Sequence, residues 1–146
     1  MIQSQDTTEA GTPPEAARIL LVEDDDALRS LLATTLRREG YAVEECCSGM
    51  DLVRCIGEYA LDHRPIGYDL AVLDIRMPGV SGLEAVQSMR ELEGWPPTIL
   101  ITAFGDQALH KQAMELGVWA VFDKPFDIQR FLDAVRRLAT RTEGPG

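Results

Sequence analysis

Short apolar runs alternate along this chain with longer segments in which apolar residues recur every three or four positions. The runs predict five strands, at 19–22, 42–45, 70–73, 98–101 and 119–122. Four of them are almost continuously apolar, which is typical of parallel strands covered on both faces. The run at 42–45 is more polar and predicts an edge strand.

The segments between the runs predict helices. One apolar stripe contains Leu28, Leu31, Leu32 and Leu36, and Gly40 would close that helix as a C-cap. A second stripe contains Leu83, Val86, Met89 and Leu92. A third follows the expected N-cap Asp127 and contains Ile128, Phe131, Leu132, Val135 and Leu138. Strand and helix therefore alternate five times, which predicts a doubly wound α/β sandwich.

Composition narrows the class of protein. Apolar residues make up 45% of the 146 residues and charged residues 26%, which predicts one globular domain over 18–140. Residues 1–17 and 141–146 are expected to be a flexible leader and a flexible tail.

The net charge of −10 argues against direct binding of nucleic acid or of an anionic membrane. No run approaches the roughly 20 apolar residues of a membrane span. Three cysteines without a CxxC spacing or a secretory leader predict a cytoplasmic location.

Polar residues follow the strands at the edge where such folds bind ligands. They are Glu23, Asp24, Asp25 and Asp26 after the first run, Asp74 after the third, Thr102 after the fourth, and Asp123 and Lys124 after the fifth. Each alone is an ordinary cap or loop residue. Carboxylates that converge, however, repel one another unless a cation neutralises them, and Mg²⁺ prefers oxygen ligands.

The same set suits transfer of a phosphoryl group to a carboxylate. One carboxylate attacks, while the metal and Lys124 neutralise charge on the phosphoryl oxygens and the hydroxyl of Thr102 orients one of them. Chemistry of this kind depends mainly on positioning.

Four segments also carry a family resemblance, which covers about 17–140. They are Ile-Leu-Leu-Val-Glu-Asp-Asp (19–25), Val-Leu-Asp-Ile-Arg-Met-Pro-Gly-Val-Ser-Gly (72–82), Ile-Thr-Ala-Phe-Gly (101–105) and Phe-Asp-Lys-Pro-Phe (122–126). In this order and at these separations they resemble the signature blocks of the receiver domain of two-component response regulators. The resemblance implies a flavodoxin-like fold with five helices and a five-stranded parallel sheet in the order 2-1-3-4-5.

The resemblance also implies roles for individual residues. Asp74 matches the phosphorylated aspartate. Mg²⁺ would be held by Asp24 directly, by Glu23 mainly through water, by Asp74 and by the backbone carbonyl of Arg76. Thr102 matches the switch hydroxyl, Phe122 the aromatic residue that moves with it, and Lys124 the family's lysine, followed by a cis bond to Pro125.

The implied partners follow the family as well. The phosphodonor would be a histidine kinase or a phosphotransfer protein, and the output surface would be the last two helices with the last strand. A downstream protein target is expected, without identification, and a phosphorylation-dependent dimer stays open. The chain would be a signalling module rather than a turnover enzyme. Whether it acts alone or is part of a longer regulator is also left open.

Two features depart from the family pattern. Residues 49–69 are longer than usual, with an insertion at 62–67 that is either a partner-binding element or a neutral elaboration; the neutral interpretation is favoured because surface loops tolerate insertions. Arg76 and Phe104 lie two residues beyond Asp74 and Thr102, where bulky side chains would shield the acyl phosphate. Slow self-dephosphorylation is therefore predicted, over many minutes, and a lifetime of seconds would contradict it.

Two rival functions remain. A degenerate receiver would act as a phosphorylation-independent interaction module, but the complete site argues against it. A metal-dependent aspartyl phosphatase would carry a second aspartate two residues beyond its nucleophile, where this chain has Arg76. The vicinal pair Cys46-Cys47 is expected to have no thiol function, and neither His63 nor His110 is an expected metal ligand.

Overall fold

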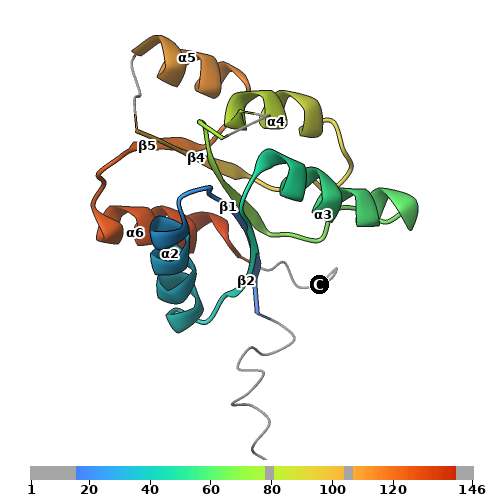
Figure 1. Cartoon of the computed structure of the whole chain (residues 1–146), viewed down its shortest axis with the longest axis horizontal. Helices are drawn as coiled ribbons and strands as arrows, with labels where there is room; N and C mark the ends of the chain where they lie inside the picture. Colours follow the sequence, from blue (N-terminus) through green and yellow to red (C-terminus); the bar gives the residue numbers. More distant parts are fainter. Residues whose placement is uncertain (1–15, 78–80, 104–106, 141–146) are drawn as a thin grey trace, which may run out of the picture.

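The computed structural model describes residues 16–77, 81–103 and 107–140, in which strands and helices alternate five times (Figure 1). In chain order the elements are β1 (Arg18–Val22), α2 (Asp26–Arg38), β2 (Ala42–Cys46), α3 (Gly49–Leu61), β3 (Leu70–Asp74), α4 (Gly82–Met89), β4 (Thr98–Thr102), α5 (Gln107–Glu115), β5 (Ala120–Asp123) and α6 (Ile128–Leu138). Each predicted strand is present, and no predicted bound differs from the observed one by more than one residue. The predicted alternation is confirmed.

The strands form one parallel sheet in the order β2-β1-β3-β4-β5. The predicted order 2-1-3-4-5 is therefore confirmed, and β2 is an edge strand as expected. The chain order of the strands reverses at β1, whose neighbours are β2 on one side and β3 on the other. In open α/β sheets the crevice at such a reversal, beyond the carboxyl ends of the strands, is the usual place for a ligand.

Helices cover both faces of the sheet (Figure 1). The α2–α6 core contains Leu32 and Leu36 of α2, Phe131 and Val135 of α6, and strand residues such as Ile101. On the opposite face, side chains of α3, α4 and α5 pack with Cys46, Leu73 and Leu100 of the strands, and we call this the α3–α5 core. Because both faces are buried, the central strands β3 and β4 are buried along their whole length.

The helix ends follow the sequence signals. The Asp25 side chain accepts a hydrogen bond from Leu28 N and caps α2, while Gly40 follows its end with φ +99°. The backbone N–H groups of Gly40 and Tyr41 donate to carbonyls of the last turn, which is the Schellman arrangement expected of glycine at this position. Asp127 caps α6 as predicted, through Gln129 N.

Two predicted members of the apolar stripes are not in the core. Leu31 lies on the solvent side of α2 and is 54% exposed. Leu92 is exposed because α4 ends at Met89, so the helical period does not continue to it. Membership of an apolar stripe at helical spacing therefore does not place these two side chains in the core.

The predicted insertion at 62–67 packs against the body of the domain. It begins where α3 ends, with His63 in the left-handed region at φ 54°. Ile66 is buried, and its N–H donates to the carbonyl of Glu93 beyond α4, at 3.0 Å. The Arg64 guanidinium stacks on the Tyr59 ring of α3. Part of the insertion thus contributes to the core, whereas partner binding by this segment stays untested.

Most of the predicted leader and the whole predicted tail lie outside the described residues. Ala17, expected to end the leader, is instead packed in the α2–α6 core, and its carbonyl accepts a hydrogen bond from Ala42 N at 3.0 Å. Phe104, invoked for slow dephosphorylation, also lies outside the described ranges. Within those ranges, no helix has the length and apolarity that a membrane crossing requires.

Candidate functional site

The reversal of strand order brings two acidic strand ends together. Glu23 directly follows β1, and Asp74 is the last residue of β3, which pairs with β1 in parallel. Both side chains are almost completely buried, whereas Asp24 is exposed. The sheet therefore supplies two buried carboxylates and one solvent-facing carboxylate at a single edge.

Lys124 joins these carboxylates from the far end of the chain. Its Nζ lies 3.1 Å from Asp74 Oδ2 and 3.2 Å from Glu23 Oε1. The bond from Lys124 to Pro125 is cis, as predicted, and Lys124 N donates to the carbonyl of Thr102 at 2.7 Å. Burial works against the ammonium ion, but the two carboxylates outweigh burial and raise the pKa of Lys124. The lysine is therefore held as a cation beside Asp74.

The electrostatics of Glu23 are unfavourable without a further cation. Burial, followed by the neighbouring carboxylate of Asp74, raises the pKa of Glu23 to about 7. Glu23 Oε2 accepts hydrogen bonds from Asp25 N and, at 3.4 Å, from Lys124 Nζ. Glu23 Oε1 lies close enough to Nζ for ion pairing, but it has no hydrogen-bond partner among the described residues. A buried carboxylate oxygen of this kind is costly unless something else satisfies it.

The donor set fits a small divalent cation. One oxygen from each of Glu23, Asp24 and Asp74 can be chosen so that all three lie within 4.8 Å of one another. These are hard oxygen donors, and the exposed position of Asp24 leaves one side open to water, which Mg²⁺ retains in its shell. Glu23 Oε1, which is buried beside Lys124 without a hydrogen-bond partner among the described residues, is an independent sign that a further ligand fits at this point.

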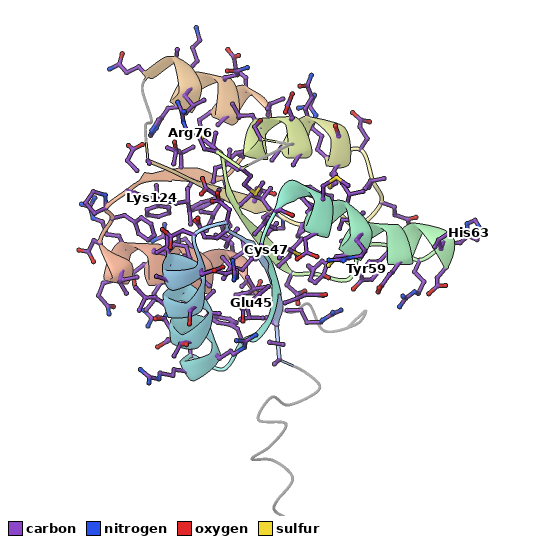
Figure 2. The ribbon with its side chains drawn as sticks, viewed as in Figure 1. Glu45, Cys47, Tyr59, His63, Arg76 and Lys124 are labelled. Atoms are coloured by element: carbon purple, nitrogen blue, oxygen red, sulfur yellow. The ribbon has the colours of Figure 1, made fainter. Side chains whose placement is uncertain are left out.

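Backbone packing fixes the position of Asp74. Its Oδ1 accepts a hydrogen bond from the N–H of Arg76 at 2.9 Å. Gly82, at the start of α4, passes so close to β3 that a Cβ atom there would lie 2.6 Å from the carbonyl oxygen of Asp74. Only glycine permits this approach. Figure 2 labels Arg76 and Lys124, which come from separate strand ends on the same side of the molecule; the Arg76 side chain is exposed.

The structure does not bring the two predicted switch residues together. Thr102 ends β4 and is fully buried; by the alternation of the strand it shares its face with Leu100 of the α3–α5 core. Phe122 belongs to the α2–α6 core, where its ring lies 5.7 Å from that of Phe126 and 5.8 Å from that of Phe131. The two side chains are thus on opposite faces of the sheet. The paired role of Phe122 stays a prediction, and this placement argues against it.

Not every acidic strand end enters the cluster. Asp25 caps α2, and Asp26 pairs with Arg29. Asp123 ends β5, but its carboxylate is half-exposed and contacts His110 Nε2 of α5 at 3.0 Å. The expectation that the carboxylates of all three strands converge was wrong for Asp123, because the side chain of the next residue, Lys124, is the one directed at the site.

The sequence analysis did not identify Arg29, whose side chain holds the acidic loop at 23–25 in place. Its guanidinium donates to the carbonyl of Glu23 at 2.8 Å and pairs with Asp26 of its own helix and Glu45 of β2. Arginine in the first turn of a helix is disfavoured by the helix dipole. That position, three residues after Asp26, was the available signal that Arg29 has a specific partner.

Comparisons with known proteins agree with this geometry. Residues 19–136 match the model of the response regulator receiver domain. The chain is 32% identical over 120 residues to sporulation initiation phosphotransferase F of Bacillus subtilis, covering 82% of this chain and 91% of that protein. It is 32% identical over 133 residues to the transcriptional regulatory protein FixJ of Azorhizobium caulinodans, covering 91% of this chain but 60% of that protein. The chain thus spans most of the first relative and under two thirds of the second.

A solved structure is also similar. The non-phosphorylated receiver domain of HemR from Leptospira biflexa superposes with a TM-score of 0.70 at 31% identity, covering 87% of this chain and 97% of that one. Receiver domains generally accept a phosphoryl group from histidine kinases or phosphotransfer proteins, and they generally bind Mg²⁺. From its fold, the geometry of its strand ends and these similarities, the chain belongs to the receiver domain family of two-component response regulators.

Proposed function

We propose that this chain accepts a phosphoryl group on Asp74 from a phosphohistidine of a histidine kinase or a phosphotransfer protein. One observation carries the proposal: Lys124 Nζ lies 3.1 Å from Asp74 Oδ2 in a buried site where Glu23 presents a carboxylate oxygen without a hydrogen-bond partner among the described residues. A nucleophile, a fixed cation and a set of carboxylate oxygens that could hold a metal ion thus occur together. Phosphoryl transfer requires these three features.

In the proposed step, the oxygen of Asp74 attacks phosphorus and an acyl phosphate forms. The bond from phosphorus to the donor's imidazole nitrogen breaks, and its electron pair stays on the imidazole, which then takes a proton from water. Lys124 stays within reach of the new phosphoryl group because it is anchored through its backbone to Thr102. The Thr102 hydroxyl would donate to another phosphoryl oxygen.

Glu23, Asp24 and Asp74 would hold Mg²⁺, together with the backbone carbonyl of Arg76. When bound, the ion supplies charge neutralisation for the transferred phosphoryl oxygens. The residues of the chain supply the rest: Asp74 is the nucleophile, and Arg29 and Arg76 N fix the acidic loop and the carboxylate of Asp74.

The proposed output is a change in affinity for a protein target at the surface formed by α5, β5 and α6. Thr102 ends the strand beside β5, so a shift of its hydroxyl toward the phosphoryl group would act on that neighbour. A phosphorylation-independent interaction module remains the alternative. An aspartyl phosphatase is weaker, because Arg76 stands where its second aspartate would be and its side chain is exposed.

Phosphorylation of the full chain by a small acyl phosphate tests the proposal directly. We expect intact-mass analysis to detect one phosphoryl group per chain in the presence of Mg²⁺ and none in EDTA, because the crowded carboxylates repel the donor unless the cation is present. Circular dichroism in both buffers serves as the folding control. A folded protein that is not modified in Mg²⁺ would favour the interaction module.

A further inference from the structure

Two cysteines meet between β2 and α3, away from the carboxylates of the site. Cys46 is the last residue of β2 and is completely buried, and Cys55 lies in the second turn of α3 and is half-buried. Their Sγ atoms are 3.4 Å apart. The sequence had drawn attention to the adjacent pair Cys46-Cys47 instead, but neighbouring strand residues point to opposite sides, and Cys47 is exposed.

A carboxylate and a phenol surround the pair. The Cys55 thiol donates to Glu44 Oε2 at 3.5 Å, and the hydroxyl of Tyr68 donates to the other oxygen of Glu44. Tyr68 is itself buried against the Tyr59 ring of α3. Glu44 thus contacts both Cys55 and Tyr68, and the two sulfur atoms lie in contact without being bonded.

The main chain around the pair is also fixed. The N–H of Cys47 donates to Asp51 Oδ2 in the first turn of α3, where Figure 2 labels Cys47 between β2 and the helix. The carbonyl of Cys46 accepts a hydrogen bond from Glu23 N at 3.1 Å. The thiol pair therefore joins a helix to the strand residue that supports the backbone of Glu23.

We propose that Cys46 and Cys55 form a dithiol site that is oxidised reversibly to an intramolecular disulfide by a low-molecular-weight disulfide such as oxidised glutathione. The half-exposed Cys55 attacks first as a thiolate, forming a mixed disulfide and releasing one thiolate of the oxidant. The Cys46 thiolate then attacks the sulfur of Cys55 and releases the second. In sum, the protein loses two protons and two electrons, and the oxidant is reduced to two thiols.

The surroundings set the rate of the first attack. Burial raises the pKa of the Cys55 thiol and the charge of Glu44 adds to this, while the contact with Cys46 and the charge of Arg54 oppose it. The reaction is therefore slow at neutral pH. Removing the charge in Glu44→Gln is expected to speed it roughly threefold or more, because more thiolate is present.

The experiment treats the reduced full chain with oxidised glutathione, alkylates the remaining thiols and maps peptides by mass spectrometry. We expect a peptide linked through Cys46 and Cys55, with Cys47 alkylated or carrying glutathione, and reversal by dithiothreitol. Cys47→Ser should form the same link. Cys55→Ser, a small change at a half-buried position, should form none.

Thermal unfolding provides a second readout. Closure of this short loop is expected to raise the Tm of the oxidised Cys47→Ser variant by roughly 5 °C over its reduced form. A wild-type chain whose cysteines carry only glutathione would overturn the proposal. So would a link through Cys47, whether to Cys46 or to a second chain, as the main product.

Discussion

Replacement of Asp74 by Asn is expected to abolish phosphorylation while leaving the domain folded. Asparagine has nearly the same shape, so its side-chain oxygen can still accept the hydrogen bond from Arg76 N that positions Asp74. The amide is not a nucleophile toward phosphorus under these conditions, and the acyl phosphate cannot form. Intact mass after incubation with a small acyl phosphate and Mg²⁺ measures the effect.

Asp123→Asn is the matched control for this loss. Asp123 also ends a strand, but its carboxylate contacts His110 and does not enter the cluster of Glu23, Asp24 and Asp74. This variant should therefore be phosphorylated to the same extent as the wild type. Modification of Asp74→Asn at the wild-type rate would place the acceptor elsewhere in the chain.

The second large effect concerns stability without metal: Glu23→Gln should make the protein more stable in EDTA. In the folded protein, burial and Asp74 raise the pKa of Glu23 to about 7 from an ordinary value of 4.5. Between these two values the folded state retains a proton that the unfolded chain has lost, so the free energy of unfolding falls as pH rises through this window. Above about pH 7 both states are ionised and the full penalty is present.

Glutamine carries no such penalty. The gain of the variant over the wild type should therefore be small near pH 4.5, grow as pH rises to about 7 and then stay constant, at about 2–3 kcal/mol. Urea unfolding across this pH range in EDTA gives the value. Glu91→Gln, at an exposed position beyond α4, serves as the control and should show no comparable rise. Equal stability of Glu23→Gln and wild type above pH 7 would contradict the claim that burial destabilises the ionised carboxylate of Glu23.

Adding Mg²⁺ should reduce the difference in free energy of unfolding between Glu23→Gln and the wild type. A cation that binds the folded state of the wild type stabilises it in proportion to its affinity, and the variant has lost one carboxylate of the donor set. Urea unfolding of both proteins in EDTA and in Mg²⁺ therefore compares the destabilisation by the crowded carboxylates with the stabilisation that they gain from a bound cation. A difference that Mg²⁺ leaves unchanged would argue against Glu23 as part of the metal site.

Local patterns predicted the elements well and their lengths less well. The continuous apolar runs identified all five strands because both sheet faces are covered, and the polar run at 42–45 correctly indicated an edge. Leu92 was assigned to a helix that ends at Met89, since an apolar residue at helical spacing does not report where the helix stops. Leu31 likewise has the spacing of its stripe but faces solvent.

Side-chain direction was the weaker part of the site prediction. Phe122 was paired with Thr102 on family resemblance, yet the alternation of the strands places the two on opposite faces of the sheet. Asp123 was counted with the acidic cluster, but it turns to His110. Both cases concern which face a residue at a strand end occupies, and the apolar pattern weakens at those ends; the role of Phe122 itself stays a prediction.

The sequence by itself determined the strand and helix content, the doubly wound class and the set of residues at the carboxyl ends of the strands. These follow from local periodicity and from the rule that parallel strands end at one edge. Only the tertiary structure decided which of these residues meet. Lys124 contacts Asp74 across 50 positions of the chain and Glu23 across 101, and Arg29 and the pair Cys46 and Cys55 acquire their partners through the placement of helices on the sheet. Such contacts depend on strand order, register and packing, which are properties of the whole domain and cannot be read from any single segment.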